Sequence, residues 1–156
     1  MKAGRVLFWS VYRAWRVPFA RKLMYVEALC RLLSAWLLIR MTPYSFWRGR
    51  LGTITKEPDL TSLNASEMAV ASQIATLHSV LLRVFGTRFT CLMLALSARG
   101  MLRSSGIPSV LILGVNRKGT AAQATELGAH AWVKCGTFDV IGHEGSETFI
   151  PVAIYR

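Results

Sequence analysis

The sequence predicts an α+β fold in which helices come first and an antiparallel sheet follows. Apolar residues recur at helical spacing over about 22–40, 64–85 and 91–105. After Pro108 the composition changes to β-branched and aliphatic residues, as in SVLILGV at 109–115, which is typical of a strand. With 156 residues, the chain is long enough for one domain that buries roughly 70% of its unfolded surface.

Two helices are expected in the N-terminal third. Residues 5–16 mix arginines with large apolar side chains and predict a short amphipathic helix that ends near Pro18. Residues 23–39 are the most apolar segment, but its 17 residues fall short of the roughly 20 that cross a bilayer. Glu27 and Arg31 can also pair on one helix face, because they are four positions apart. We therefore expect a buried or interfacial helix rather than a transmembrane one.

A loop or linker is expected over 42–63, and the two helices after it have recognisable starts. Asn64 can cap the first of them, and Glu67 lies three positions later, as in a capping box. Thr90 is a suitable N-cap for the second, which makes Cys91 the first residue of that helix.

The last third predicts antiparallel strands with a polar loop over 116–128. The strands are expected at 109–115, 129–135, 138–143 and 147–155. Gly136 and Thr137 form the turn of the central hairpin. Pro151 has no N–H to donate to a neighbouring strand, which indicates an edge position or a bulge.

Positive charge is concentrated in the first third of the chain. Residues 1–50 hold ten Lys or Arg and one acid, whereas residues 51–156 hold nine basic and seven acidic residues. Such a block attracts anionic lipid, acidic protein or another polyanion. Because the sequence has no zinc-finger spacing, RNP motif or convincing helix-turn-helix signal, we do not expect nucleic acid as the partner. We expect a cytoplasmic protein whose basic third contacts a partner protein or the membrane face.

The cysteines argue for a reducing compartment and against a metal site. Cys30, Cys91 and Cys135 are odd in number and far apart in sequence, so neither a disulfide framework nor a metal cluster is expected. No cofactor is expected either.

Cys91 is the candidate nucleophile, because the start of a helix favours the thiolate form. Three histidines could serve as its base. His78 is expected at a surface or boundary position of the preceding helix. His130 opens a strand between two small alanines, which leave its imidazole room to reach across a cleft. The alternative is an inert, packed cysteine, since cysteine is among the most buried residue types.

Four stretches, in this order, carry a resemblance to a known family: TCLMLALSARGMLRSSGIPSVLILGVN, AHAWV, DVIGH and TFIPVAIY. They resemble the stand-alone leader peptidase of lasso peptide biosynthesis, the peptidase half of the split B protein, in the transglutaminase-like superfamily. The resemblance covers about 64–156 well and implies a transglutaminase-like or papain-like cysteine peptidase core there. The basic region 1–63 would then be a helical N-terminal part and linker.

The resemblance also implies an activity and its partners. A cysteine protease would remove the leader from a ribosomally made precursor peptide, with Cys91 as nucleophile and His130 as general base. A separate recognition protein would present the leader. An ATP-dependent, asparagine-synthetase-like cyclase would then join the freed core amine to an Asp or Glu side chain.

The third catalytic residue stays open, because the family's aspartate falls where this chain has Gly142 and His143. A two-residue turn would pair Lys134 with Asp139 and His130 with His143. Asp139 would then lie roughly 13 Å along the ladder from His130. Geometry favours His143 or Glu144 and residue type favours Asp139, while a backbone carbonyl or a water could also orient the ring.

Trp132 shares the face of His130, two positions on, and either lines the substrate cleft or packs. Two other functions remain open. One is an acyltransferase of the same fold, in which an amine replaces water as acceptor. The other is a non-catalytic basic scaffold with an inert cysteine that docks to a membrane or a complex.

Overall fold

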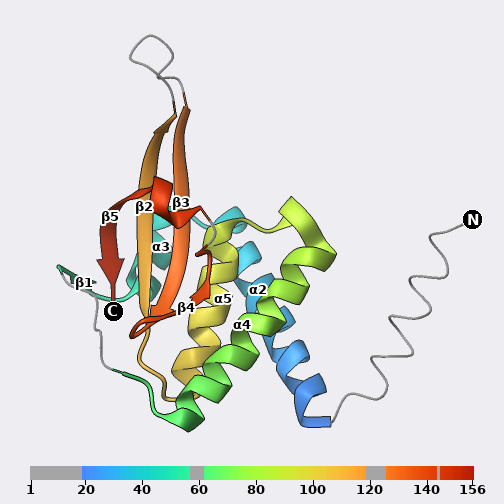
Figure 1. Ribbon diagram of the computed structural model, residues 1–156. Coiled ribbons are helices and arrows are strands. Elements are labelled where there is room, and N and C mark those ends of the chain that lie inside the picture. Colours follow the sequence, from blue (N-terminus) through green and yellow to red (C-terminus); the bar gives the residue numbers. More distant parts are fainter. Residues whose placement is uncertain (1–18, 57–61, 119–125, 144) are drawn as a thin grey trace, which may run out of the picture.

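A layer of helices covers one face of a five-stranded antiparallel sheet in the computed structural model, which describes residues 19–56, 62–118, 126–143 and 145–156 (Figure 1). The helices are α2 (Phe19–Met41), α3 (Tyr44–Trp47), η1 (Arg48–Leu51), α4 (Ala65–Phe85), η2 (Gly86–Arg88), α5 (Cys91–Ser104) and η3 (Ser146–Thr148). The strands are β1 (Ile54–Thr55), β2 (Val110–Lys118), β3 (Glu126–Cys135), β4 (Phe138–Ile141) and β5 (Ile150–Tyr155), in the order β1-β5-β2-β3-β4. The predicted helix over 5–16 lies outside the described residues.

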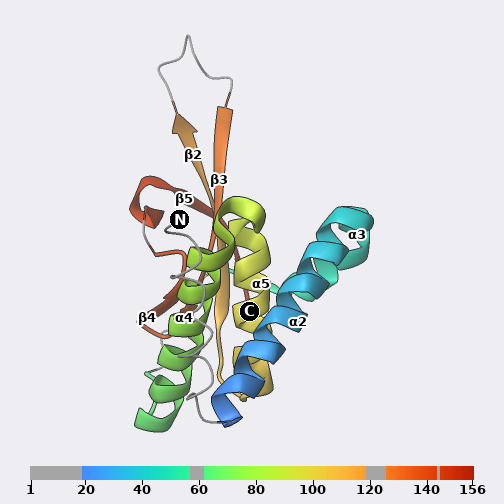
Figure 2. The same ribbon diagram turned by 90° about the vertical axis from the view of Figure 1, so that its right-hand side faces the viewer.

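Helix α5 is the central element of the helical layer. It packs against β3 on one side and against α2 on the other, while α4 contacts α5 and β4. Figure 2 shows α2 and α3 reaching away from the sheet, so that much of α2 is at the surface. Ala28 and Leu32 of α2 are fully buried in the same core as α4 and α5. The described part of region 1–63 is therefore not packed separately from the rest.

The predicted helix starts are confirmed. The Asn64 side chain accepts a hydrogen bond from the Glu67 N–H at 2.9 Å, and the Glu67 carboxylate accepts one from the Asn64 N–H at 2.9 Å. Helix α5 begins at Cys91, and Thr90 caps it by accepting from the Met93 N–H at 3.4 Å. These bonds satisfy N–H groups that a helix leaves without an intrahelical acceptor.

Two predicted loops are more ordered than their composition indicates. β2 and β3 extend into the expected polar loop as far as the pair Lys118 and Glu126, and residues 119–125 lie outside the description. The expected linker contains α3, η1 and β1, because Trp47 and Leu51 are buried and supply apolar anchors. Polar composition correlates with loops but does not cause them. Strand pairing or burial of apolar anchors can therefore give such a segment regular structure.

The bulge predicted at Pro151 is confirmed. The β2–β5 register shifts between Leu113 and Gly114, so that Gly114 pairs with Pro151 while Leu113 pairs with Ala153. Proline interrupts the ladder there because it has no N–H to donate.

The two faces of the sheet carry separate apolar clusters. Ala131, Val133 and Cys135 of β3 belong to the large core beneath the helices. Trp132, the residue between the first two, packs instead with Val110 and Ile112 on the other face. Successive side chains of a strand alternate in this way, which decides where the candidate catalytic residues of β3 can point.

Within the described residues, α4 is the one helix that is long and apolar enough to cross a membrane. The segment 23–39 in α2, which the sequence analysis identified as the most apolar, does not meet this criterion. Because Ile74, Leu77 and Leu81 of α4 are buried against the core, its apolar character has an explanation within the fold.

Candidate active site

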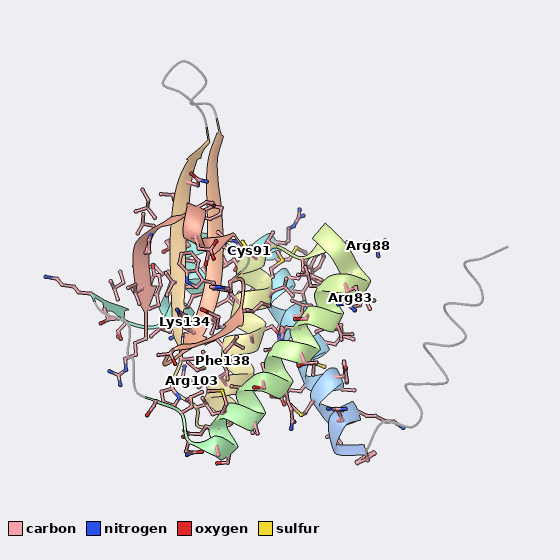
Figure 3. The ribbon with its side chains drawn as sticks, viewed as in Figure 1. Arg83, Arg88, Cys91, Arg103, Lys134 and Phe138 are labelled. Atoms are coloured by element: carbon pink, nitrogen blue, oxygen red, sulfur yellow. The ribbon has the colours of Figure 1, made fainter. Side chains whose placement is uncertain are left out.

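Cys91 lies at the first turn of α5, half-buried, next to the sheet (Figure 3). The backbone N–H of Leu94 donates to the Thr90 carbonyl and that of Met93 to the Thr90 hydroxyl. Helix geometry leaves the N–H groups of Cys91 and Leu92 without an intrahelical acceptor. Together with the helix dipole, they provide a site that favours negative charge at or near the sulfur.

The other two cysteines lack this environment. Cys135 is fully buried in the core, and desolvation raises the pKa of its thiol to about 12. Cys30 is exposed on α2, in the middle of the helix. Of the three, Cys91 alone combines a helix start with partial access to solvent.

His130 is held by a backbone carbonyl. Its Nε2 lies 2.8 Å from the carbonyl oxygen of Gly142, the residue that follows β4. A carbonyl only accepts hydrogen bonds, so Nε2 carries the proton and donates it. In the neutral ring, Nδ1 is then the nitrogen that can accept a proton from a nucleophile.

Gly142 is required by the path of the chain. Its φ of +80° is unfavourable for other residues, and a Cβ there would lie 2.7 Å from the Ala131 carbonyl oxygen and 2.9 Å from the Trp132 Cβ. This is the position where the resemblance places an aspartate. The structure has the backbone carbonyl in its place, which was one of the alternatives left open by the sequence.

The other candidates for the third residue form a separate cluster. His143 Nδ1 lies 3.0 Å from the Asp139 carboxylate, and the Lys134 ammonium lies 3.3 Å from the same group. His143 Nε2 is also 3.8 Å from Glu147. None of the described contacts joins this cluster to His130, and Glu144 lies outside the described residues.

A bulge explains why the expected pairing of His130 with His143 is wrong. The turn pairs Lys134 with Asp139 as predicted, but Val133 pairs with Ile141 instead of Val140. The extra residue shifts everything beyond it by one position.

Trp132 and Phe149 hold the ring of His130. Its centroid lies 5.8 Å from that of Trp132, with nearly parallel planes, and 5.1 Å from that of Phe149. Gly114 makes room for the indole, because a Cβ there would lie 2.8 Å from it. Trp132 is only 6% exposed, so of its two expected roles the structure supports packing rather than a cleft wall.

The structure does not bring Cys91 and His130 into direct contact among the interactions it describes. The ring of His130 lies with Trp132 and Phe149, whereas Cys91 packs with the core beneath the helices. Because side chains alternate along β3, His130 lies on the face of the sheet that Trp132 shares, opposite to the face that the helices cover.

His78 is buried, not a surface or boundary residue as expected. Nδ1 lies 2.9 Å from the Ile74 carbonyl oxygen and Nε2 lies 3.0 Å from the Ser97 hydroxyl, so both nitrogens are occupied within the core. Desolvation lowers its pKa. The sequence did carry a signal, because His78 falls within the apolar stripe formed by Ile74, Leu77 and Leu81.

Comparison with known proteins yields one family. The model described as the transglutaminase-like superfamily matches residues 35–153, from within α2 to within β5. No curated protein and no solved structure matches the chain.

Proposed function

The chain belongs to the transglutaminase-like superfamily, and from this premise we propose that it is a cysteine peptidase that removes the leader of a ribosomally made lasso precursor peptide. The superfamily's fold suits cysteine peptidases and acyltransferases, which share a thioester intermediate. The observation that carries the proposal is Cys91, half-exposed at the capped start of a helix.

The proposed chemistry uses Cys91 as nucleophile and His130 as base. Nδ1 of His130 takes the proton from the Cys91 thiol, and the thiolate attacks the carbonyl carbon of the leader–core peptide bond. The resulting oxyanion is stabilised by the N–H groups of Cys91 and Leu92, at about 3 kcal/mol for each well-placed donor. When the C–N bond breaks, the protonated ring gives its proton to the leaving amine, and water then hydrolyses the thioester.

This mechanism requires the ring of His130 to leave the face of the sheet that it shares with Trp132 and to approach Cys91 when the substrate binds. Catalytic contacts are often longer or unformed in the absence of substrate. The bond to Gly142 keeps Nε2 protonated without adding a negative charge. It therefore orients the ring, but it stabilises the protonated ring less than a carboxylate would.

The proposed partners follow from the peptide substrate. A separate recognition protein presents the leader, and the freed core amine passes to an ATP-dependent, asparagine-synthetase-like cyclase. The exposed face of α2 is proposed to lie on an anionic membrane surface in the cytoplasm. In support, Leu23, Val26, Leu33 and Leu37 are exposed along one helix whose exposed charges, Arg21 and Arg40, are both basic.

The cleavage proposal is tested by incubating precursor peptide, recognition protein and this chain, and measuring peptide masses. Leader release should fall at least 10³-fold in Cys91→Ala and by a similar factor in His130→Ala, because each removes a reacting group. Cys30→Ala is the matched control and should cleave normally, since Cys30 is exposed on α2. Leader release by Cys91→Ala at the wild-type rate would contradict the assignment.

Two further experiments distinguish the peptidase from an acyltransferase and from a non-catalytic scaffold. Added hydroxylamine should leave the product mass mostly at the hydrolysis value, whereas an acyltransferase would give chiefly the hydroxamate. The rate of iodoacetamide labelling, followed over a range of pH in Cys30→Ala, should be higher at neutral pH than that of an unactivated thiol, because the start of a helix favours the thiolate. A scaffold with an inert cysteine would label slowly throughout that range.

A further inference from the structure

A basic groove lies between α2, η1 and α5, away from the candidate active site. It consists of two adjoining pockets of ≈ 680 and ≈ 640 Å³, which share Gly49, Arg99 and Arg103. Arg103 lies at the end of α5 opposite to Cys91 (Figure 3). The twelve positions from Cys91 to Arg103 correspond to about 18 Å of helix.

Positive charge lines this groove. Arg31, Arg50, Arg99 and Arg103 line the first pocket, and Arg99, Arg103 and Arg156 line the second. Among the described residues, no aspartate or glutamate lines either pocket. Arg31 pairs with Glu27 at 2.9 Å, and Glu27 does not belong to the groove lining.

Arg99 is the most informative of these residues, because it is partly buried beside another cation. It donates to the carbonyl of Leu51, a neutral partner. Desolvation, and after it the charge of Arg103, lowers the pKa of Arg99. A desolvated guanidinium next to a like charge is unfavourable, and an incoming anion would relieve both penalties.

Glycine residues create the space for these side chains. A Cβ at Gly52 would lie 2.1 Å from the backbone oxygen of Arg156 and 2.8 Å from Nη2 of Arg99, and a Cβ at Gly100 would lie 2.8 Å from Nη1 of Arg31. Gly100 is inside α5, where glycine is less favourable than alanine because it loses more conformational freedom. The glycine lowers the stability of the helix at this point, but it allows the guanidinium group of Arg31 to lie against the helix backbone.

We propose that this groove binds an acidic segment of a peptide, with its carboxylates on Arg50, Arg99 and Arg103. Guanidinium groups bind carboxylates through paired, charge-assisted hydrogen bonds. Each pocket is far larger than a single carboxylate or phosphate, and together the two adjoining pockets offer room for several side chains of a peptide. Leu38, Leu96 and Ile107 in the lining would accommodate the apolar side chains between the acids.

The test measures binding directly and needs no cleavage, so it is independent of the proposed peptidase activity. A fluorescein-labelled 12-residue peptide that alternates Glu with Leu and Ala is titrated with the protein at 150 mM salt, and its anisotropy is recorded. Arg99→Gln and Arg103→Gln should each weaken binding about tenfold, since each removes a hydrogen-bonded charge pair.

The matched controls are Arg83→Gln and Arg88→Gln, which change the net charge equally on another part of the surface (Figure 3). They should weaken binding less than twofold. Equal losses in all four variants would mean diffuse attraction and overturn the proposal. Equal binding of the peptide with Gln in place of Glu would also overturn it.

A small-anion site is the remaining outcome. If 10 mM inorganic phosphate displaces the peptide completely at constant ionic strength, the groove is a phosphate site and the proposal is wrong. Arg103→Gln carries the test by itself if Arg99→Gln does not fold, because Arg103 is exposed whereas Arg99 bonds to the Leu51 carbonyl.

Discussion

The ring of His130 is oriented by the hydrogen bond that it donates to the backbone carbonyl of a glycine, Gly142. The carbonyl that accepts from Nε2 belongs to a residue whose φ is positive, a conformation that favours glycine. A side chain at this position would contact the Ala131 carbonyl and the Trp132 Cβ. The chain therefore cannot restore an aspartate here without moving the end of β4.

Substitution of Gly142 by alanine is predicted to reduce both stability and leader cleavage. Gly145→Ala is its matched control, because Gly145 has almost the same φ of +81° but nothing within 4 Å of the point where a Cβ would lie. Both variants should lose about 1–2 kcal/mol from backbone strain. Gly142→Ala should lose a further 1–3 kcal/mol or so from overpacking, measured by urea unfolding. Equal losses of unfolding free energy in the two variants would show that a Cβ at position 142 does not clash with Ala131 and Trp132.

At the scale of elements, His78 connects three helices. It lies on α4, its Nε2 contacts Ser97 of α5, and the Ser97 hydroxyl lies 3.1 Å from the Ala28 carbonyl oxygen of α2. Nδ1 lies against the Ile74 carbonyl, and the single hydroxyl proton of Ser97 goes to Nε2 or to the Ala28 carbonyl but not to both. Burial disfavours the charged ring, because removing the charge from water costs free energy.

This histidine predicts a stability loss in mild acid. Its folded-state pKa is lowered, below the unfolded value of about 6.5, so the folded protein binds fewer protons. The stabilisation is complete above that value and is lost as pH falls towards the lowered folded pKa. The urea midpoint should fall more between pH 7.5 and 5.5 in the wild type than in His78→Gln. An equal fall in both proteins would show that the effect does not arise at His78.

At the scale of the whole molecule, the outer face of α2 has no partner among the described residues. Phe19, Leu23, Val26, Leu33 and Leu37 follow one another at spacings of three, four and seven, which places them on one side of the helix. Two copies that paired through this face would bring Arg21 and Arg40 of each copy near like charges. An anionic membrane surface would neutralise them instead.

Leu33→Glu combined with Leu37→Glu is predicted to abolish sedimentation with phosphatidylglycerol-containing vesicles. Each buried leucine contributes about 1.5–3 kcal/mol, so the loss should exceed tenfold in the partition coefficient. Val152→Glu on β5 is the control, because Val152 is also exposed and lies on a different element. Vesicles of phosphatidylcholine alone should bind weakly. Unchanged binding of the double variant would place the membrane contact elsewhere or refute it.

Local signals in the sequence determined the helix starts, the position of Cys91 and the turn that pairs Lys134 with Asp139. Each of these features depends on residues within a few positions of one another. It therefore forms whatever the rest of the chain packs against that segment. The α+β class followed from the change in apolar period, and the family match agrees with the resemblance at the level of the superfamily.

Only the tertiary structure decided which groups surround those residues. The bulge after Val133 replaced His143 with the Gly142 carbonyl, and alternation along β3 placed His130 with Trp132 rather than beneath the helices. The burial of His78 and the exposure of one face of α2 were settled by the packing of distant helices. These features depend on contacts between segments far apart in the chain, and no short stretch of sequence contains them.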